Sequence, residues 1–215
     1  MPKGSLELTN KRKNEILDAC EAIYRSQGFY GVTVKEISTK VSMTRPAIYH
    51  YFETKEEILL ALLIREYDRW CSELEAMPER ARGMTRDGLS ELIAGSLNDK
   101  DILLRILNMN LYEIELNSRT ERLADFKVQY KRCVTALHRI LRGWRSDVTD
   151  GECDDFTLVF SSFLFGVYPF TKHTEKQAEA MRMAGFQMDE PSIHEMVRKA
   201  LLKVLPQDSG LNGGI

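Results

Sequence analysis

Residues 33–55 read TVKEISTKVSMTRPAIYHYFETK, and this stretch decides the fold. It holds three threonines, at positions 33, 44 and 54, and a threonine side chain can accept a hydrogen bond from the free N–H groups that begin a helix. Two of them, Thr33 with Glu36 and Thr54 with Glu57, also have the spacing of a capping box. The three predicted helix starts are only 11 and 10 residues apart, so the first two helices must be very short. The stretch therefore predicts a helix-turn-helix that leads into a further helix.

The predicted helix that begins at Thr44 has two faces of different chemistry. An apolar set is expected to pack inward, as a helix-turn-helix requires when its other side meets a DNA groove. That set comprises Ile37 and Val41 on the preceding helix, Met43 at the turn, and Ile48 and Phe52 on this helix.

The outward set is suited to double-stranded DNA. Arg45 can donate two hydrogen bonds to a guanine, and Pro46 or Ala47 can contact a thymine methyl group. Thr44 and Tyr49 have hydroxyl groups that can donate to phosphates, and His50 is suited to either role. The alternative interpretation of these positions is an ordinary solvated helix face.

Two flanking residues, Thr33 and Lys55, are candidates for phosphate contacts that fix the register on DNA. Thr33 is expected mainly to cap the helix, and a phosphate contact is compatible with that role. Outside this motif, a lysine such as Lys55 would be interpreted as an ordinary surface residue. Residues 1–55 carry nine Lys and Arg against six Asp and Glu, whereas the whole chain has a net charge of −2. A basic amino-terminal part on an acidic body favours a polyanionic partner.

The four cysteines, at positions 20, 71, 133 and 153, lack zinc-ligand spacing, and so do His138, His173 and His194. The cysteine spacing argues against a zinc site and a disulfide framework, and indicates a reducing cytoplasm. There is no signal-peptide core, and the apolar stretch 156–170 is too short for a membrane span and predicts a buried helix. The sequence contains no GxSxG nucleophile elbow, no GxxxxGK(S/T) phosphate-binding loop and no HExxH zinc motif. Neither an enzymatic activity nor a cofactor is therefore expected.

Helical periodicity dominates the chain and predicts an all-α fold. The first helix is expected over 10–27, ended by Gly28, and the helix after the helix-turn-helix over 54–77, followed by a flexible connection at 79–87. Later helices are expected at 88–98, 100–117, 119–144, 154–170, 174–184 and 192–205. The predicted domains are a helix-turn-helix domain at 1–55, a carboxy-terminal helical domain at 56–206 and a disordered tail at 207–215.

The segment TVKEISTKVSMTRPAIYHYFETKEEIL closely resembles the amino-terminal domain of the tetracycline-repressor (TetR) family. Three positions depart from the family pattern: Ser38 where Ala is common, Ser42 where the turn usually has Gly, and Met43 where Val is common. Ser42 is notable because that turn residue is often left-handed, which costs a serine more than a glycine. The matching residues are Gly28, Phe29, Thr33, Val34, Ile37, Ile48, Tyr49, Tyr51, Phe52, Lys55 and Ile58.

The resemblance implies a homodimer that binds a palindromic operator, and repression that ends when an unknown small-molecule effector binds the carboxy-terminal domain. Apolar helices at 156–168 and 192–205 are compatible with a four-helix dimer interface. The alternative is a carboxy-terminal bundle that serves as a protein-interaction scaffold without an effector. The predicted residues of the ligand pocket are Met109, Tyr112, Phe126, Tyr130 and Phe163. Each of them can equally be an ordinary residue of the hydrophobic core.

Overall fold

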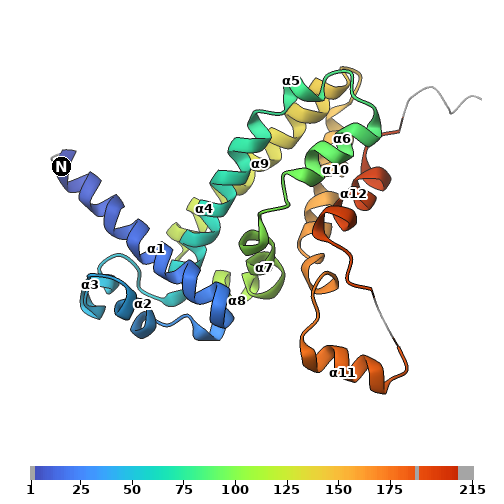
Figure 1. The fold of residues 1–215 in the computed structure, drawn as a ribbon. Coiled ribbons are helices and arrows are strands. Elements are labelled where there is room, and N and C mark those ends of the chain that lie inside the picture. Colours follow the sequence, from blue (N-terminus) through green and yellow to red (C-terminus); the bar gives the residue numbers. More distant parts are fainter. Residues whose placement is uncertain (1–2, 187–188, 208–215) are drawn as a thin grey trace, which may run out of the picture. The chain divides into compact units, whose positions relative to one another are not determined.

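The computed structural model describes residues 3–186 and 189–207, and every regular element there is helical (Figure 1). The predicted all-α class is confirmed. Of the tail predicted to be disordered, residues 208–215 lie outside the described residues. In the described part of the chain, no helix combines the length and the apolar character that crossing a membrane requires.

Twelve α-helices and one 3₁₀-helix follow one another along the described chain. They are α1 (Lys3–Gly31), α2 (Val34–Lys40), α3 (Arg45–Tyr49), α4 (Lys55–Glu75), α5 (Pro78–Ala81), α6 (Arg86–Gly95), α7 (Asp101–Met109), α8 (Leu111–Leu116), α9 (Thr120–Trp144), α10 (Asp150–Leu164), η1 (Tyr168–Phe170), α11 (Glu175–Met183) and α12 (Ile193–Val204).

Helix α1 begins seven residues earlier than its sequence periodicity predicts. Leu6 and Leu8 are 59% and 52% exposed, so the first turns contribute no apolar stripe by which they could be recognised. Gly28 interrupts the helix with a φ of 69°, as expected for a glycine in the left-handed region.

Two further predictions of helix limits are wrong. The segment 79–87, expected to be a flexible connection, contains α5 and the start of α6, whose cap Thr85 accepts a hydrogen bond from the backbone N–H of Gly88. The single helix expected over 100–117 is split at Asn110 into α7 and α8. The Asn110 side chain accepts a 2.7 Å hydrogen bond from the buried hydroxyl of Tyr24. This contact holds the break against α1.

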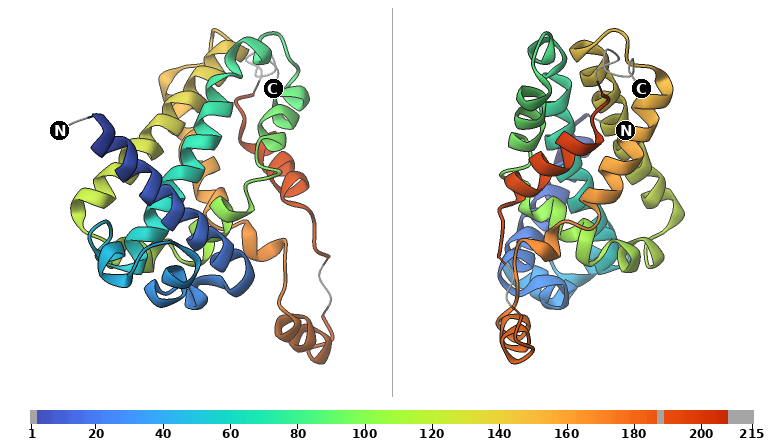
Figure 2. Two further views of the ribbon diagram at one scale, coloured as in Figure 1. Left: turned by 60° about the vertical axis from the view of Figure 1, so that its left-hand side comes forward. Right: turned by 90° about the vertical axis from the view of Figure 1, so that its right-hand side faces the viewer.

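The chain forms two compact units. Unit 1 comprises residues 1–68 and 109–130, and unit 2 comprises residues 69–108 and 131–215. The core of unit 1 joins α1 to the short helices, with fully buried Ile16, Ile23 and Ile37. In unit 2, α12 packs on both α6 and α10 (Figure 2). The division at residue 55 that the sequence indicates stays a prediction.

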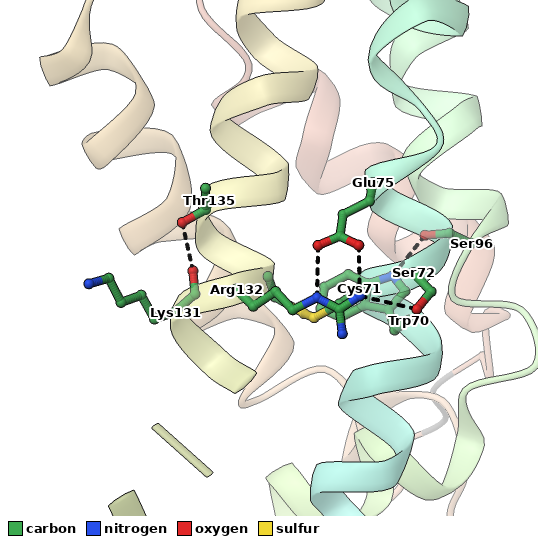
Figure 3. The surroundings of a disulfide bond; sticks show 9 residues. Trp70, Cys71, Ser72, Glu75, Ser96, Lys131, Arg132 and Thr135 are labelled. Atoms are coloured by element: carbon green, nitrogen blue, oxygen red, sulfur yellow. Dashed lines mark hydrogen bonds and ion pairs between the residues drawn. A yellow bond between two sulfur atoms is a disulfide. The ribbon is translucent and has the colours of Figure 1, made fainter. Parts of the chain in front are cut away.

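Helices α4 and α9 pair along their length and run in the same direction. Going along both helices, Glu57 binds Arg119, the Tyr67 ring lies 5.6 Å from that of Phe126, and Cys71 is joined to Cys133. The disulfide links residues 62 apart in sequence, with a Cα–Cα distance of 5.0 Å (Figure 3). The sequence argues against a disulfide framework and does not predict this single bond, because the pairing comes from helix packing and leaves no local spacing signal.

The turn between α2 and α3 is held by α1. Ser42 donates to the carboxylate of Glu15 twice, from its backbone N–H at 2.7 Å and from its hydroxyl at 2.9 Å. No described residue other than glycine has a positive φ, so the left-handed conformation considered for Ser42 is not adopted. These two hydrogen bonds hold the pKa of Glu15 below its ordinary value of 4.5.

Replacing Glu15 with alanine is expected to lower the thermal midpoint near pH 7, because the Ser42 contacts are lost. A carboxyl whose folded-state pKa is depressed stabilises the fold above its ordinary pKa and loses that effect as pH falls. The difference between wild type and Glu15→Ala should therefore shrink below the ordinary value of 4.5. Thermal melts from about pH 7 to about pH 3.5 measure this. Glu7→Ala, on the same helix, is the control; a Glu15→Ala deficit that is constant with pH would contradict the assignment.

Candidate DNA-binding surface

Local hydrogen bonds set the limits of the short helices. Thr33 begins α2, and its hydroxyl oxygen accepts from the backbone N–H of Glu36 at 3.0 Å. Thr44 is the residue before α3, but its side chain makes no capping hydrogen bond. Pro46 lies in the first turn of α3, where a missing N–H costs little. The three predicted starts are confirmed, with Thr44 acting by its extended backbone alone.

The inward side of α3 is apolar, as predicted. Ile37 and Ile48 are completely buried, and Phe52 and Met43 are 3% and 8% exposed. Val41 differs, since it is half-buried at the extended residue that ends α2. This core fixes which side of α3 faces away from the protein.

Five of the six predicted contact residues on and beside α3 are exposed: Thr44, Arg45, Pro46, Tyr49 and His50. Ala47, the sixth, is half-buried. Among the described residues, Arg45 has neither a hydrogen bond nor an ion pair, so its five N–H donors are directed at solvent. An unpaired guanidinium at the start of such a helix is suited to bind a guanine edge or a phosphate.

The two flanking residues, Thr33 and Lys55, already interact with other parts of the protein. Thr33 is exposed but its hydroxyl already serves as a cap. The Lys55 ammonium lies 4.2 Å from the centroid of the Phe29 ring and 3.9 Å from a carboxylate oxygen of Glu56. Its side chain is 27% exposed. The stacking on Phe29 gives Lys55 a fixed position that the sequence does not reveal.

Four further basic residues near this segment of the chain are exposed, and the sequence motif does not predict them individually as DNA contacts. Lys35 and Lys40 on α2 are exposed, and so are Lys11 and Arg12 on α1. Residues 33–55 contain four basic and two acidic side chains. The run of basic residues at 11–13 is the only signal in the sequence that could have added α1 to the surface.

A buried carboxylate supports the turn between α3 and α4. The Glu57 side chain is completely buried and accepts from Nε and Nη2 of Arg119 at 2.5 and 2.8 Å and from the backbone N–H of Glu53 at 2.9 Å. Burial alone would raise the pKa of Glu57, but these hydrogen bonds outweigh it and lower that pKa. The Thr54 hydroxyl donates to the carbonyl of Asn117 at 3.1 Å, which ties the same turn to the start of α9.

Each unit has an open groove. The groove in unit 1 has a volume of about 310 Å³, and its polar lining comprises Asn10, Lys13, Asn14, Glu57, Arg122 and Asp125. Its apolar part is formed by Leu17, Phe52, Leu60, Ala61 and Ile64. The groove in unit 2 has a volume of about 580 Å³ and lies among the end of α4, α5 and α6.

The five predicted pocket residues are divided between the two units, with Phe163 in unit 2 and the other four in unit 1. Phe126 is buried and packs with Tyr130, with ring centroids 6.5 Å apart. Met109 and Tyr112 are 57% and 81% exposed, and Phe163 is half-buried in unit 2. The residues that line the two grooves do not include any of them. Their role in ligand binding stays a prediction. Within the described chain, no cluster of His, Cys, Asp and Glu is arranged to hold a metal ion.

Comparison with known proteins gives relatives for both halves of the chain. Curated relatives include the transcriptional repressor Rv1474c of Mycobacterium tuberculosis, 30% identical over 90 residues (42% of this chain and 47% of the relative). The repressor AcnR of Corynebacterium diphtheriae is 36% identical over 62 residues (29% and 33%). The matched part thus spans less than half of each relative.

Solved structures share the fold along nearly the whole chain. A putative TetR-family regulator from Mesorhizobium loti has a TM-score of 0.59 at 15% identity, covering 91% of this chain and 94% of its own. The fatty acid degradation regulator FadR from Bacillus halodurans has a TM-score of 0.56 at 15% identity, covering 94% and 96%.

Family models match most of the sequence. Residues 16–62 match the bacterial regulatory proteins of the tetR family, and residues 64–205 match the tetracyclin repressor-like carboxy-terminal domain. These two matches cover the helix-turn-helix and the helical body that follows it. The chain therefore belongs to the TetR family of bacterial regulatory proteins.

Proposed function

We propose that this chain is a DNA-binding transcriptional regulator that acts in the cytoplasm as a homodimer, represses at a palindromic operator and is released by a small-molecule effector. One observation carries the DNA-binding part: α3 buries Ile48 and leaves Arg45, Tyr49 and His50 exposed, with Arg45 unpaired among the described residues. Family membership supports the same function. In a twofold dimer, two such helices would meet two half-sites of a palindrome.

Exposed apolar side chains on α10 support the dimer. Leu158 and Val159 are 68% and 48% exposed, on the side of α10 away from the buried Phe156 and Phe160. On α12, Val197 and Leu201 are buried, while Ile193, Met196 and Ala200 stay half-exposed. A second copy of the chain would remove these residues from water, which is favourable in proportion to the apolar area buried.

The groove in unit 1 supports an effector. Its volume of about 310 Å³ is at the lower end of the range of small-molecule sites, so unit 1 has space for an effector. Lys13 has no hydrogen bond or ion pair among the described residues, and the Arg122 guanidinium is 3.7 Å from its acidic neighbour Asp125. Two carboxylates also line the groove, but Glu57 is paired with Arg119 and Asp125 with Arg122, so among the described residues Lys13 is the cation left without a partner there. A cation beside an apolar floor favours an amphipathic anion, such as a carboxylate with a hydrocarbon chain.

The DNA-binding proposal is tested by selecting bound duplexes from random DNA and measuring affinity for the selected operator. Arg45→Ala should weaken binding by about 1–3 kcal/mol, roughly 5–150-fold, and relax the preference at one base in each half-site. Arg182→Ala, an exposed arginine on α11, is the matched control and should bind as wild type does. Unchanged affinity and base preference in Arg45→Ala would show that Arg45 does not contact the operator bases.

The dimer is tested with Leu158→Glu. The side chain is 68% exposed in one copy, so the substitution should leave each copy folded while it places a charge in the interface. We expect sedimentation to report a monomer, circular dichroism to report unchanged helix content, and operator affinity to fall. Ala180→Glu, at an exposed position on α11 and not on α10, is the control and should remain dimeric. A Leu158→Glu protein that remains dimeric would place the interface elsewhere.

The effector groove is tested with decanoate as the probe. Calorimetry should detect its binding to the wild type, and its addition should release the selected operator. Ala61→Trp fills the groove from α4 and should abolish decanoate binding, whereas Ala180→Trp on α11 should not. Equal binding of decanoate to both variants would exclude this groove as the site and return attention to the five predicted pocket residues.

A further inference from the structure

The disulfide joins one selected pair among the four cysteines. Cys71 on α4 and Cys133 on α9 are bonded, whereas Cys20 and Cys153 are buried free thiols. Burial raises the pKa of the Cys20 thiol to about 12 and also raises the pKa of Cys153. Neither residue is bonded to another cysteine, so they offer no alternative to the Cys71–Cys133 pairing.

The bond lies at a particular place along the chain. Helices α4 and α9 each begin in unit 1 and end in unit 2. Cys71 is three residues beyond Asp68, and Cys133 is three residues beyond Tyr130, which are the last residues of unit 1 on these helices. Unit 1 carries α2 and α3. The disulfide thus ties the two helices together just after each has left the unit that carries the candidate DNA-binding surface.

Contacts other than the disulfide hold the same two helices side by side. The Arg132 guanidinium donates from Nε and Nη2 to the two carboxylate oxygens of Glu75, at 2.7 Å each, and from Nη2 to the Ser72 hydroxyl at 3.2 Å (Figure 3). One turn before the cysteine, the Tyr67 ring packs on Phe126. Because these contacts do not depend on sulfur chemistry, reduction of the disulfide would leave the two thiols facing each other. A pair held in this way can form its bond repeatedly.

We propose that Cys71 and Cys133 are a reversible, peroxide-sensitive modification site that sets how firmly α4 is tied to α9, and thereby tunes operator binding. The second part of this inference rests on the proposed DNA-binding function.

The oxidation balances with hydrogen peroxide as the oxidant. Cys133 is 3% exposed and Cys71 is 0% exposed, so Cys133 is the residue that peroxide meets first. Its thiolate attacks one peroxide oxygen, so that an S–O bond forms and the O–O bond breaks. The departing hydroxide takes up a proton and leaves as water. The Cys71 sulfur then attacks the Cys133 sulfur, the S–S bond forms, the S–O bond breaks and a second water leaves. Overall, two thiols lose two protons and two electrons, and peroxide takes up both.

The oxidised form should bind the operator more tightly. With the disulfide closed, α4 cannot slide along or turn against α9 at this point, so fewer arrangements of the helix that leads from α3 are available. Binding to two half-sites at a fixed spacing then costs less ordering. With the disulfide open, the other contacts between the helices remain, but the Arg132–Glu75 pair next to the cysteines is partly exposed and restrains them only weakly.

The test uses the purified full chain, reduced with dithiothreitol, desalted without oxygen and then treated with hydrogen peroxide. Thiol titration in denaturant should fall from four thiols to two, and peptide mapping should recover a Cys71–Cys133 linked peptide. Dithiothreitol should restore four thiols in the native protein. Affinity for the selected operator should be about fivefold or more higher in the oxidised form. Cys153→Ser is the matched control and should behave as wild type, whereas Cys71→Ser and Cys133→Ser should bind the operator equally in both conditions.

Three outcomes would overturn the inference. Native protein that keeps the disulfide under dithiothreitol would make the bond a permanent cross-link. Four thiols after peroxide treatment would show that the oxidant does not reach the pair. Equal operator affinity in the two redox states would remove the regulatory role. The wild-type comparison needs no variant, so a serine variant that fails to fold does not prevent the test. If no operator is selected at all, the proposed function fails, while thiol titration still decides the modification.

Discussion

The burial of one charge, the Glu57 carboxylate, constrains the whole helix-turn-helix region. A carboxylate taken out of water is costly unless charged and hydrogen-bonding partners surround it. Arg119 and the backbone N–H of Glu53 supply those partners, and Thr54 adds a hydrogen bond to Asn117. The turn after α3 and the turn before α9 must therefore lie together. Because α3 ends only a few residues before this turn, the position of the candidate recognition helix depends on a contact 62 residues away in sequence.

The parallel pairing of α4 and α9 extends this constraint along the chain. The contacts change in kind from one end to the other: an ion pair at Glu57, aromatic packing at Tyr67 and a covalent bond at Cys71. Each resists relative motion differently. Aromatic packing tolerates small shifts, hydrogen bonds in the ion pair of the buried Glu57 with Arg119 require a defined geometry, and a disulfide fixes the separation within narrow limits. The pair can therefore be adjusted at a single point by chemistry at sulfur.

The sequence was informative wherever an interaction was local. The caps at Thr33 and Thr54, the buried face of α3 and the break at Gly28 all follow from residues a few positions apart. It failed where partners are distant. The Cys71–Cys133 bond, the split at Asn110 and the burial of Glu57 each need a partner 62 or more residues away, and no periodicity encodes such a contact. The early start of α1 was missed for another reason, since exposed turns carry no apolar pattern.

The hydrogen bonds from Ser42 to Glu15 make the recognition segment dependent on a helix that precedes it. Many engineering schemes treat such a segment as a cassette that can be moved between relatives to exchange operator specificity. In this chain, a transplanted segment with glycine at position 42 would keep the backbone hydrogen bond to Glu15 and lose the one from the hydroxyl. A transplant into a relative without a carboxylate at the position of Glu15 would lose both. A portable unit must therefore include at least the stretch from Glu15 to Phe52, so that α1 is moved together with the turn it holds, and the recipient must also supply the Glu57–Arg119 contact.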